Sequence, residues 1–388
     1  MKRGQYVFLS QDRVIFGQAT ASAVQAEADR LGAKRLFIVT SKTLNRTTDA
    51  IEKIRQALGG RHVGTFDGCI AHTPRQSVID AAAAAREANP DLIVTIGGGT
   101  AIDTAKVMLI CLAHDVTSAA GLDDWHVKMM EDGTRRVPDV LAPPCRQIVV
   151  PTTLSGAEFS NLGGCTDPVR KIKDAYTGKE IGALSVILDP EITTHTPEWL
   201  WLSTGIRAVD HAVEGICSVD AQPFTDATQL HALRLFRTSL PRNKAAPEDL
   251  DARLDSQLAV WLASTGINRI AYGASHGIGH ALGGAANVPH GYTSCVMLPA
   301  VLRYNQPATA DKQKAISAAF DRPKDAAADC VADLIKALGM PATLRAVGLK
   351  REQFDDVARA AMHNIWVRTN PQPIKSEADV KAILETVW

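Results

Sequence analysis

Three histidines lie close together in the stretch ASHGIGHALGGAANVPHG, at positions 276, 280 and 290. His276 and His280 are four residues apart, so a helix would place both side chains on one face. His290 follows a proline and precedes a glycine, as at a turn or at the start of the next helix. Histidine can bind metals and transfer protons near neutral pH, and the neighbouring glycines permit close approach. We therefore expect a reactive site here rather than three unrelated packing residues.

A fourth candidate histidine, His211, lies in the stretch GIRAVDHAVEGICS. An acid four residues earlier would complete a metal-binding pair on one helix face, but that position holds Arg207. Asp210 is adjacent to His211, and one helical residue turns its side chain about 100° away, so we do not expect it to replace the acid. A guanidinium has no lone pair for a cation. At ~5 Å and an effective dielectric constant of ~20, it repels each unit of metal charge by about 3 kcal/mol. The sequence therefore favours function without a metal.

A glycine-rich turn lies in TIGGGTAIDTAK, residues 95–106, between a buried strand and a helix. Glycines without Cβ atoms let backbone N–H groups approach an anion, and the helix start adds partial positive charge. This predicts a cradle for a diphosphate. The turn has neither the Walker pattern nor GxGxxG, so the Rossmann fingerprint does not apply. The candidate cofactor residues are Gly97, Gly98, Gly99, Thr100 and Asp103, although Asp103 and Lys106 could equally cap and brace the helix.

The elements that must position these residues change in character along the chain. Up to about residue 190, runs of β-branched residues alternate with alanine-rich helical stretches, which predicts a parallel sheet covered on both faces. We expect strands at 13–17, 35–41, 62–68, 91–99, 146–153 and 183–190, with helices at 19–33, 47–60 and 77–90. Beyond residue 190, apolar residues recur at helical spacing, in 226–240, 250–266, 326–339 and 352–364. This half is predicted to be almost wholly helical.

We therefore predict an α/β dinucleotide-binding domain over residues 1–190 and an all-helical substrate or catalytic domain over 191–388, with the site in the cleft between them. Lys+Arg and Asp+Glu balance at 42 each, which argues against nucleic acid or acidic membranes as partners. The seven cysteines form no CxxC pair, as in a reduced cytoplasmic enzyme. No apolar run approaches the ~18 residues of a membrane span, and no signal-peptide core is present.

The glycine turn and the histidine block together resemble the iron-containing alcohol dehydrogenase family, which has the dehydroquinate synthase-like fold. The resemblance covers nearly the whole chain and rests on GGG[ST]xxDxAK and on the histidine spacing. It implies that the turn holds the diphosphate of a nicotinamide dinucleotide and that the protein is a homodimer. His211, His276 and His290 match metal-ligand positions, and His280 matches a histidine assigned to proton transfer. Arg207 occupies the position of the aspartate ligand in metal-bearing members.

The segment PTTLSGAEFS, residues 151–160, is one residue shorter than its counterpart in the metal-dependent members. It resembles the maleylacetate reductase branch of the family, as does AHTP at residues 71–74. The resemblance places Thr152, Thr153 and Ser155 on the nicotinamide side. That branch commonly has asparagine where this chain has Arg207, which could stabilise an alkoxide or hold a substrate carboxylate. The alternative is a surface ion pair between Arg207 and Asp210.

Cofactor choice depends partly on the residue that ends the second predicted strand. An acid there would bind the ribose hydroxyls of NAD and repel the 2′-phosphate of NADP. Here the position holds Ser41, followed by Lys42. We therefore expect the protein to use both NADH and NADPH.

These observations predict an NAD(P)H-dependent, metal-independent dehydrogenase or reductase for a small, carboxylate-bearing carbonyl, enone or alcohol. His280 is the expected proton relay, and His211, His276, His290 and Arg207 shape the catalytic pocket. Three alternatives remain open. One is a metal-dependent alcohol dehydrogenase, with iron or zinc on His211, His276 and His290. The others are a dehydroquinate synthase-type lyase and a dinucleotide-binding protein without catalysis.

Overall fold

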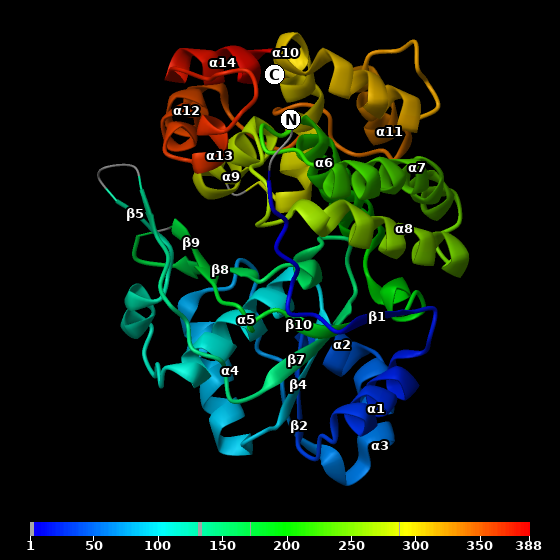
Figure 1. Cartoon of the computed structure of the whole chain (residues 1–388), viewed down its shortest axis with the longest axis vertical. Helices are drawn as coiled ribbons and strands as arrows, with labels where there is room; N and C mark the ends of the chain where they lie inside the picture. The colour runs from blue at the N-terminus through cyan, green and yellow to red at the C-terminus, as the bar shows by residue number, and fades with distance from the viewer. Residues whose placement is uncertain (1–3, 131–133, 171, 287) are drawn as a thin grey trace. The chain divides into compact units, whose positions relative to one another are not determined.

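The computed structural model describes residues 4–130, 134–170, 172–286 and 288–388. The chain separates into two compact units (Figure 1). One unit is Val7–His195, and the other is Thr196–Trp388 together with the N-terminal segment up to Tyr6. The predicted boundary at residue 190 and the predicted cleft site stay predictions.

The first unit contains a six-stranded sheet in the order β1-β10-β7-β4-β2-β3. Every neighbouring pair in this sheet is parallel, which confirms the predicted α/β class. The strands are β1 (Arg13–Phe16), β2 (Leu36–Thr40), β3 (His62–Phe66), β4 (Leu92–Gly97), β7 (Arg146–Pro151) and β10 (Ala183–Leu188).

Helices cover both faces of this sheet (Figure 1). Along β2, Leu36 and Ile38 enter a core with α1 (Thr20–Leu31) and α3 (Ala50–Leu58). The alternate residues Phe37 and Val39 enter a second core with α4 (Arg75–Ala88) and α5 (Gly99–Ala113). Because side chains alternate between two buried faces, a central strand is apolar throughout. This is why the sequence identified these strands as unbroken apolar runs.

Several short elements of this unit were not predicted. They are α2 (Lys42–Thr47), the antiparallel pairs β5 (Lys128–Met129) with β6 (Arg135–Arg136) and β8 (Leu162–Asp167) with β9 (Ile172–Thr177), and the 3-10 turns η1 (Gly59–Arg61), η2 (Ala120–Asp124), η3 (Ala157–Phe159) and η4 (Ile192–His195). In β8, buried residues alternate with partly exposed ones and two are glycines. Such a strand gives only a weak signal, because glycine favours neither strand nor helix.

In its described residues, the second unit is helical, as predicted. Its helices are α6 (Glu198–Cys217), α7 (Pro223–Ala245), α8 (Leu250–Ala263), α9 (Ala274–Ala286), α10 (His290–Ala319), α11 (Ala327–Ala337), α12 (Phe354–Met362), α13 (Ile365–Arg368) and α14 (Glu377–Glu385), with the 3-10 turns η5 (Ser264–Gly266) and η6 (Arg351–Gln353). None of the described helices is both long and apolar enough to cross a membrane.

Helix α6 is the innermost helix by burial, since every residue from Trp201 to Cys217 is buried. It packs on α7 and α10, while α9 joins a core with α10, α12 and α14. Arg207, Asp210 and Glu214 of α6 therefore lie inside the unit rather than on its surface. This burial decides the electrostatics of the candidate site.

Candidate active site

The first feature of the site is a buried ion pair on α6. Arg207 and Asp210 are 4% and 0% exposed, and Arg207 Nη1 lies 3.6 Å from Asp210 Oδ2. The same Nη1 donates to Ser294 Oγ of α10 at 3.0 Å. Asp210 Oδ2 accepts from Ser294 at 2.6 Å and from Ser275 at 2.8 Å. The ion pair considered as the alternative to a catalytic role therefore exists, but it is buried and not at the surface, because α6 is buried along nearly its whole length.

Burial sets the proton affinities of this pair. It lowers the pKa of Arg207, which Asp210 partly opposes. It raises the pKa of Asp210 to about 6, against the opposing effects of Arg207 and the two serine hydroxyls. A buried charge is tolerated when it is paired and hydrogen-bonded. Arg207 and Asp210 pair with each other, and both form hydrogen bonds with serine hydroxyls.

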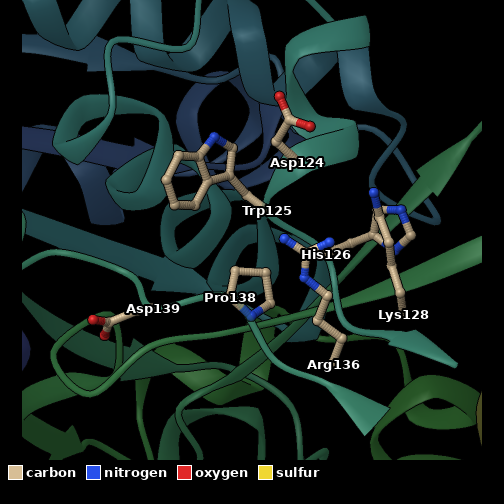
Figure 2. A pocket seen from close by; sticks show the side chains of 7 residues that line it. All are labelled: Asp124, Trp125, His126, Lys128, Arg136, Pro138 and Asp139. Carbon is tan, nitrogen blue, oxygen red and sulfur yellow. The ribbon is translucent and has the colours of Figure 1, made fainter. Parts of the chain in front are cut away.

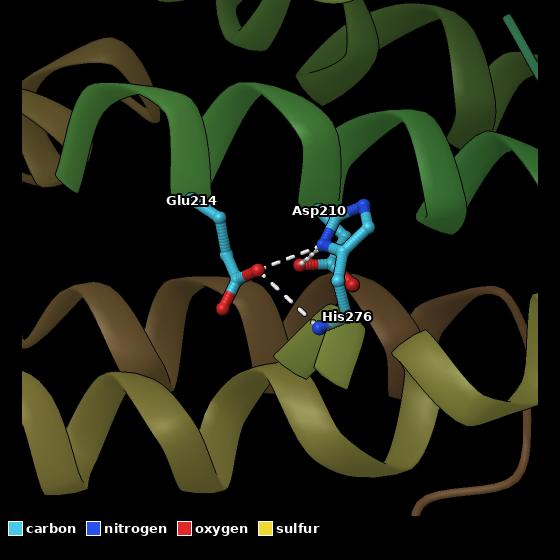
Figure 3. Close-up of side chains that lie close together, drawn as sticks. All are labelled: Asp210, Glu214 and His276. Atoms are coloured by element: carbon cyan, nitrogen blue, oxygen red, sulfur yellow. Dashed lines mark hydrogen bonds and ion pairs between the residues drawn. The ribbon is translucent and has the colours of Figure 1, made fainter. Parts of the chain in front are cut away.

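The second feature is Glu214, one turn after Asp210 on α6. Its side chain reaches the first residues of α9 (Figure 3). Its carboxylate accepts backbone N–H groups from Gly273 at 2.9 Å, Ser275 at 2.8 Å and His276 at 3.3 Å. Asn370 accepts the remaining N–H nearby, from Ala274, at 3.0 Å. The first N–H groups of a helix have no partner within the helix, so these side chains cap α9. Burial and the nearby Asp210 raise the pKa of Glu214, whereas the backbone donors lower it.

The candidate histidines form two pairs. His276 Nε2 lies 2.9 Å from His211 Nδ1, and the His276 Nδ1 lies 2.7 Å from Glu214. The rings of His280 and His290 stack with their centroids 5.3 Å apart. Burial and the charge of Arg207 hold the pKa of His276 well below its usual range, so its ring is neutral. The structure therefore brings His211 to His276 and His280 to His290.

Two aromatic residues that the sequence analysis missed complete this region. Tyr272 stacks on His276 at 4.3 Å between ring centroids. The ring centroid of Trp366 of α13 lies 5.6 Å from that of His276 and 4.6 Å from that of His280. Trp366 therefore contacts one member of each histidine pair. Tyr272 lies four residues before His276, in the segment that precedes α9, so helical spacing could not have identified it. Trp366 is far away in the sequence, and only the tertiary fold brings it here.

The glycine turn lies in the other unit, at the end of β4. Gly97 has φ of 153°, and Gly98 precedes α5, whose start has no side-chain cap. A Cβ on Gly98 would lie 2.8 Å from Thr153 Cγ2, and one on Gly99 would lie 3.3 Å from Ser155 Oγ. Uncapped N–H groups at a helix start bind anions. These residues fit the diphosphate of a nicotinamide dinucleotide.

The remaining loop positions follow from the order of strands. Because β7 pairs with β4, Thr152 follows β7 beside the glycine turn, and its N–H donates to Gly97 O at 3.0 Å. Ser41 caps α2 by accepting from Leu44 N at 3.2 Å. Thr100 lies in the first turn of α5, where its carbonyl accepts from Thr104 Oγ1 at 2.8 Å.

The two polar residues further along α5 brace the fold. Asp103 lies 3.2 Å from Lys173 of β9. Lys106 is fully buried and donates to the carbonyls of Ala157 at 2.6 Å and Leu162 at 2.8 Å. Lys106 thus fixes the segment that follows β7 against α5. These contacts agree with the bracing role considered from the sequence, and cofactor binding by Asp103 stays a prediction.

Glu158, in that same segment, was not singled out from the sequence. It is 1% exposed, and its Oε2 has no hydrogen-bond partner among the described residues. Burial raises its pKa to about 7, against the attraction of Lys106. Its carboxyl group therefore changes protonation state near neutral pH.

A cavity of about 370 Å³ lies elsewhere in the first unit (Figure 2). It is lined by Asp124, Trp125, His126, Lys128, Arg136, Pro138 and Asp139. Charges of both signs surround it, and Trp125 stacks on His114 at 3.4 Å between centroids. None of the predicted site residues lines it.

One unit has a parallel sheet with an uncapped, glycine-rich helix start, and the other has two histidine pairs, of which His211 and His276 are buried. Such features are those of a dinucleotide-dependent oxidoreductase. Residues 11–190 match the family model of iron-containing alcohol dehydrogenases, and residues 201–388 match the C-terminal model of the same family. The chain belongs to the iron-containing alcohol dehydrogenase family.

Individual relatives agree with this membership. The chain is 34% identical to the dehydrogenase FUM7 of Gibberella moniliformis, over 98% of this chain and 96% of that protein. It is 29% identical to maleylacetate reductase 1 of Cupriavidus pinatubonensis, over 97% of this chain and 95% of that protein. The crystal structure of maleylacetate reductase from Agrobacterium tumefaciens superposes on this chain with a TM-score of 0.83. The two sequences are 26% identical, and the match covers 100% of this chain and 99% of that one. The predicted resemblance to the maleylacetate reductase branch is confirmed, and the chain is a dehydrogenase or reductase.

The family name implies iron, but these side chains do not offer the expected ligands. Arg207, at the aspartate position, is hydrogen-bonded and buried. His276 Nε2 is engaged with His211. Among the described residues, the group of potential ligands that lies close together is Asp210, Glu214 and His276, which differs from the predicted set. In that group both oxygens of Glu214 already accept N–H groups. The donor set therefore does not fit a resident metal.

Proposed function

We propose that this protein is an NAD(P)H-dependent reductase that transfers hydride to a small carboxylate-bearing carbonyl or enone, and does so without a metal. The observation that carries the proposal is the buried guanidinium of Arg207, one helical turn before His211 on α6. It supplies a fixed positive charge where metal-bearing relatives are expected to have a ligand. The relatives named maleylacetate reductases support a substrate of this class.

Arg207 keeps hydrogen-bonding capacity for a ligand. Within the described chain, its partners Ser294 and Asp210 both lie at Nη1. The N–H groups of Nε and Nη2 therefore remain for a substrate oxygen. A guanidinium binds a carboxylate through two parallel hydrogen bonds, so of the two roles considered for Arg207 we choose binding of the substrate carboxylate. Ser294 fixes the side chain in place, so little reorganisation is needed on binding.

The reduction requires a hydride and a proton. A nicotinamide held at the glycine turn would provide the hydride for the electrophilic carbon of the substrate. His280 donates the proton, either to the carbonyl oxygen or, for an enone, to the carbon beside the carbonyl. His211, His276 and His290 provide the polar surroundings of the reacting group.

We assign the diphosphate to Gly97, Gly98, Gly99 and Thr100, and the nicotinamide side to Thr152, Thr153 and Ser155. Ser41 offers a hydroxyl where NAD-specific enzymes have an acid, so both NADH and NADPH are expected to serve. A more than hundredfold lower turnover with NADPH than with NADH would contradict this. The seven free thiols accord with a cytoplasmic enzyme, and we expect a homodimer.

The test compares substrates with and without a carboxylate. Maleylacetate and related oxo acids are assayed against their methyl esters, with wild-type protein and with Arg207→Ala and Arg207→Lys. Loss of a charge-assisted pair costs about 1.5–3 kcal/mol, so kcat/KM for the acids should fall about 10- to 100-fold in Arg207→Ala. Values for the esters should change less than about threefold.

An unchanged kcat/KM for the acids would remove Arg207 from the mechanism. Net consumption of NAD(P)H distinguishes this reductase from a lyase that uses the nicotinamide transiently. Absence of turnover across a broad panel of carbonyls and alcohols would instead favour a binding protein.

A further inference from the structure

We propose that the cavity of the first unit binds a small organic anion, namely a carboxylate on a flat apolar body, as in an aromatic acid. The cavity measures about 370 Å³, a size in the range of ligand pockets (Figure 2). Its lining includes Lys128 of β5 and Arg136 of β6. Binding there is independent of the proposed reduction and of the residues assigned to it.

The first observation is a pair of like charges that lie opposite each other on two strands. Lys128 and Arg136 are register partners of β5 and β6, and both line the cavity. Opposite residues of an antiparallel pair project from the same face, and two like charges in such positions destabilise the pair. Among the described residues, neither side chain has an ion-pair partner. An anion bound between them converts this repulsion into attraction.

The second observation is a buried polar group beside this pair. His126 comes two residues before Lys128, is 8% exposed, and lines the same cavity. Its Nδ1 lies 3.1 Å from the carbonyl oxygen of Val127 and 3.7 Å from Asp174 Oδ1. Within the part of the chain that the structure describes, its Nε2 has no hydrogen-bond partner. The ring is therefore held through one nitrogen and keeps the other for a ligand.

The third observation concerns the apolar part of the lining, which consists of Trp125 and Pro138. Trp125 stacks on His114 with ring centroids 3.4 Å apart and an interplanar angle of 23°, so its indole is held in place. Aromatic rings stack on flat apolar groups and bury a large area. The ligand should therefore carry a flat apolar body beside its charged group.

The acidic residues of the lining limit the charge of the ligand. Asp124 and Asp139 also line the cavity, and among the described residues no ion pair joins them to Lys128 or Arg136. Figure 2 shows Asp139 beyond Pro138 as seen from Lys128. The two acids offset the two bases, so a doubly charged phosphate gains little net attraction. A single carboxylate fits the basic side, where a guanidinium binds it through two parallel hydrogen bonds.

The decisive measurement locates benzoate on the wild-type protein by ¹⁹F NMR. The six tryptophans are labelled as 5-fluorotryptophan, and the signals of Trp125 and Trp366 are assigned with Trp125→Phe and Trp366→Phe. Benzoate should shift the Trp125 signal in a saturable way. Benzamide, which lacks the charge, and inorganic phosphate, which lacks the flat body, should bind at least about tenfold more weakly. A benzoate shift of Trp366 alone, or no shift of Trp125, would overturn the proposal.

Three variants test the pair of like charges. Lys128→Met and Arg136→Met each remove one charge and should weaken benzoate binding at least about fivefold in the same titration. Without benzoate, neither should lower the melting temperature, because each removes a repulsion between opposite residues. Arg135→Met is the matched control, since Arg135 pairs with Met129 on the same two strands and does not line the cavity. Its affinity for benzoate should stay within about twofold of the wild-type value.

An equal loss of affinity in Arg135→Met would mean that benzoate responds only to net charge, and the proposal would fail. Unchanged affinity in both Lys128→Met and Arg136→Met would contradict it as well. Tighter binding of phosphate or benzamide than of benzoate would overturn the ligand class. None of these measurements uses turnover, so a failure of the proposed function leaves their outcome unaffected.

Discussion

At the scale of single residues, the site depends on charges that burial makes strong. Arg207 and Asp210 lie three residues apart on α6, and both form a hydrogen bond with Ser294. Neither charge is therefore isolated. Removing one partner of such a pair typically costs 3–5 kcal/mol, because the other charge stays buried. The proposed catalytic role of Arg207 therefore has to be separated from its structural role. The ester controls do this, since a folding defect would affect acids and esters alike.

Ser41 provides a prediction about cofactor choice. Aspartate caps helices as well as serine, so Ser41→Asp should keep the start of α2 intact. Its carboxylate would repel the 2′-phosphate of NADPH and accept from the ribose of NADH. We expect kcat/KM with NADPH to fall at least about tenfold and that with NADH to stay within about threefold. Equal effects on both cofactors would place Ser41 away from the ribose.

Glu158 provides a prediction about pH. Its pKa is raised from 4.5 to about 7, so between these values the folded protein holds a proton that the unfolded chain has lost. The contribution of Glu158 to the free energy of unfolding is therefore fully present below about pH 4.5. It falls by about 3 kcal/mol as the pH rises from 4.5 to 7. Glu158→Gln should remove this loss, so its stability relative to wild type should rise between pH 5 and pH 8.

Urea unfolding at several pH values measures this difference. Glu87→Gln, at an exposed position of α4, is the matched control and should track the wild type. A constant difference between Glu158→Gln and wild type across the pH range would show that Glu158 is ionised in the folded protein.

At the scale of elements, α9 fits its neighbours closely. A Cβ on Gly277 would lie 2.6 Å from Val367 Cγ2 and 2.9 Å from Val367 N, so α13 would have to move. Gly284, on the same helix, has open space at the corresponding point.

We expect Gly277→Ala to destabilise the protein by about 1–3 kcal/mol and to lower kcat, because α13 carries Trp366 beside the histidines. Gly284→Ala should stabilise it by about 0.5–1 kcal/mol, because alanine is the better helix former. Denaturant unfolding and steady-state kinetics of both variants check this. Equal stability of the two would mean that α9 and α13 are not packed as described.

What the sequence could predict at this scale follows from local patterns. Buried parallel strands such as β4 give continuous β-branched runs, and the spacing of His276 and His280 identifies one helix face. The pairing of the histidines and the cap by Glu214 could not be predicted, because both depend on how α6 crosses the start of α9. The sequence analysis did not identify Trp366 and Glu158 for the same reason, because their surroundings are formed by residues distant in the sequence.

At the scale of the whole molecule, the family is clear but its usual metal is in question. The two family models together span residues 11–190 and 201–388, so the chain has both regions of the family. The α/β class and the helical second half were predicted from the sequence and are confirmed. The substrate follows from no fold-level feature, since pocket side chains differ among relatives of the same fold.

Metal analysis gives the prediction at this scale. Protein purified without chelators should contain far less than one iron or zinc per chain. Dipicolinate treatment should leave turnover and melting temperature unchanged, and added Fe²⁺ or Zn²⁺ should not increase turnover. Stoichiometric metal whose removal abolishes activity would instead support the alternative of a metal-dependent dehydrogenase with an altered ligand set.

The tight contact of Gly277 with Val367 also affects how such proteins are recognised in genomes. The glycines between His276 and His280 satisfy packing that a metal-free enzyme needs as much as a metal-bearing one. A motif search built on this helix therefore retrieves chains by a shared structural fit. The proposed difference from metal-bearing members lies on α6, at the position of Arg207. If the protein proves to work without a metal, a survey of iron dependence has to score the position of Arg207 as well as the histidine motif.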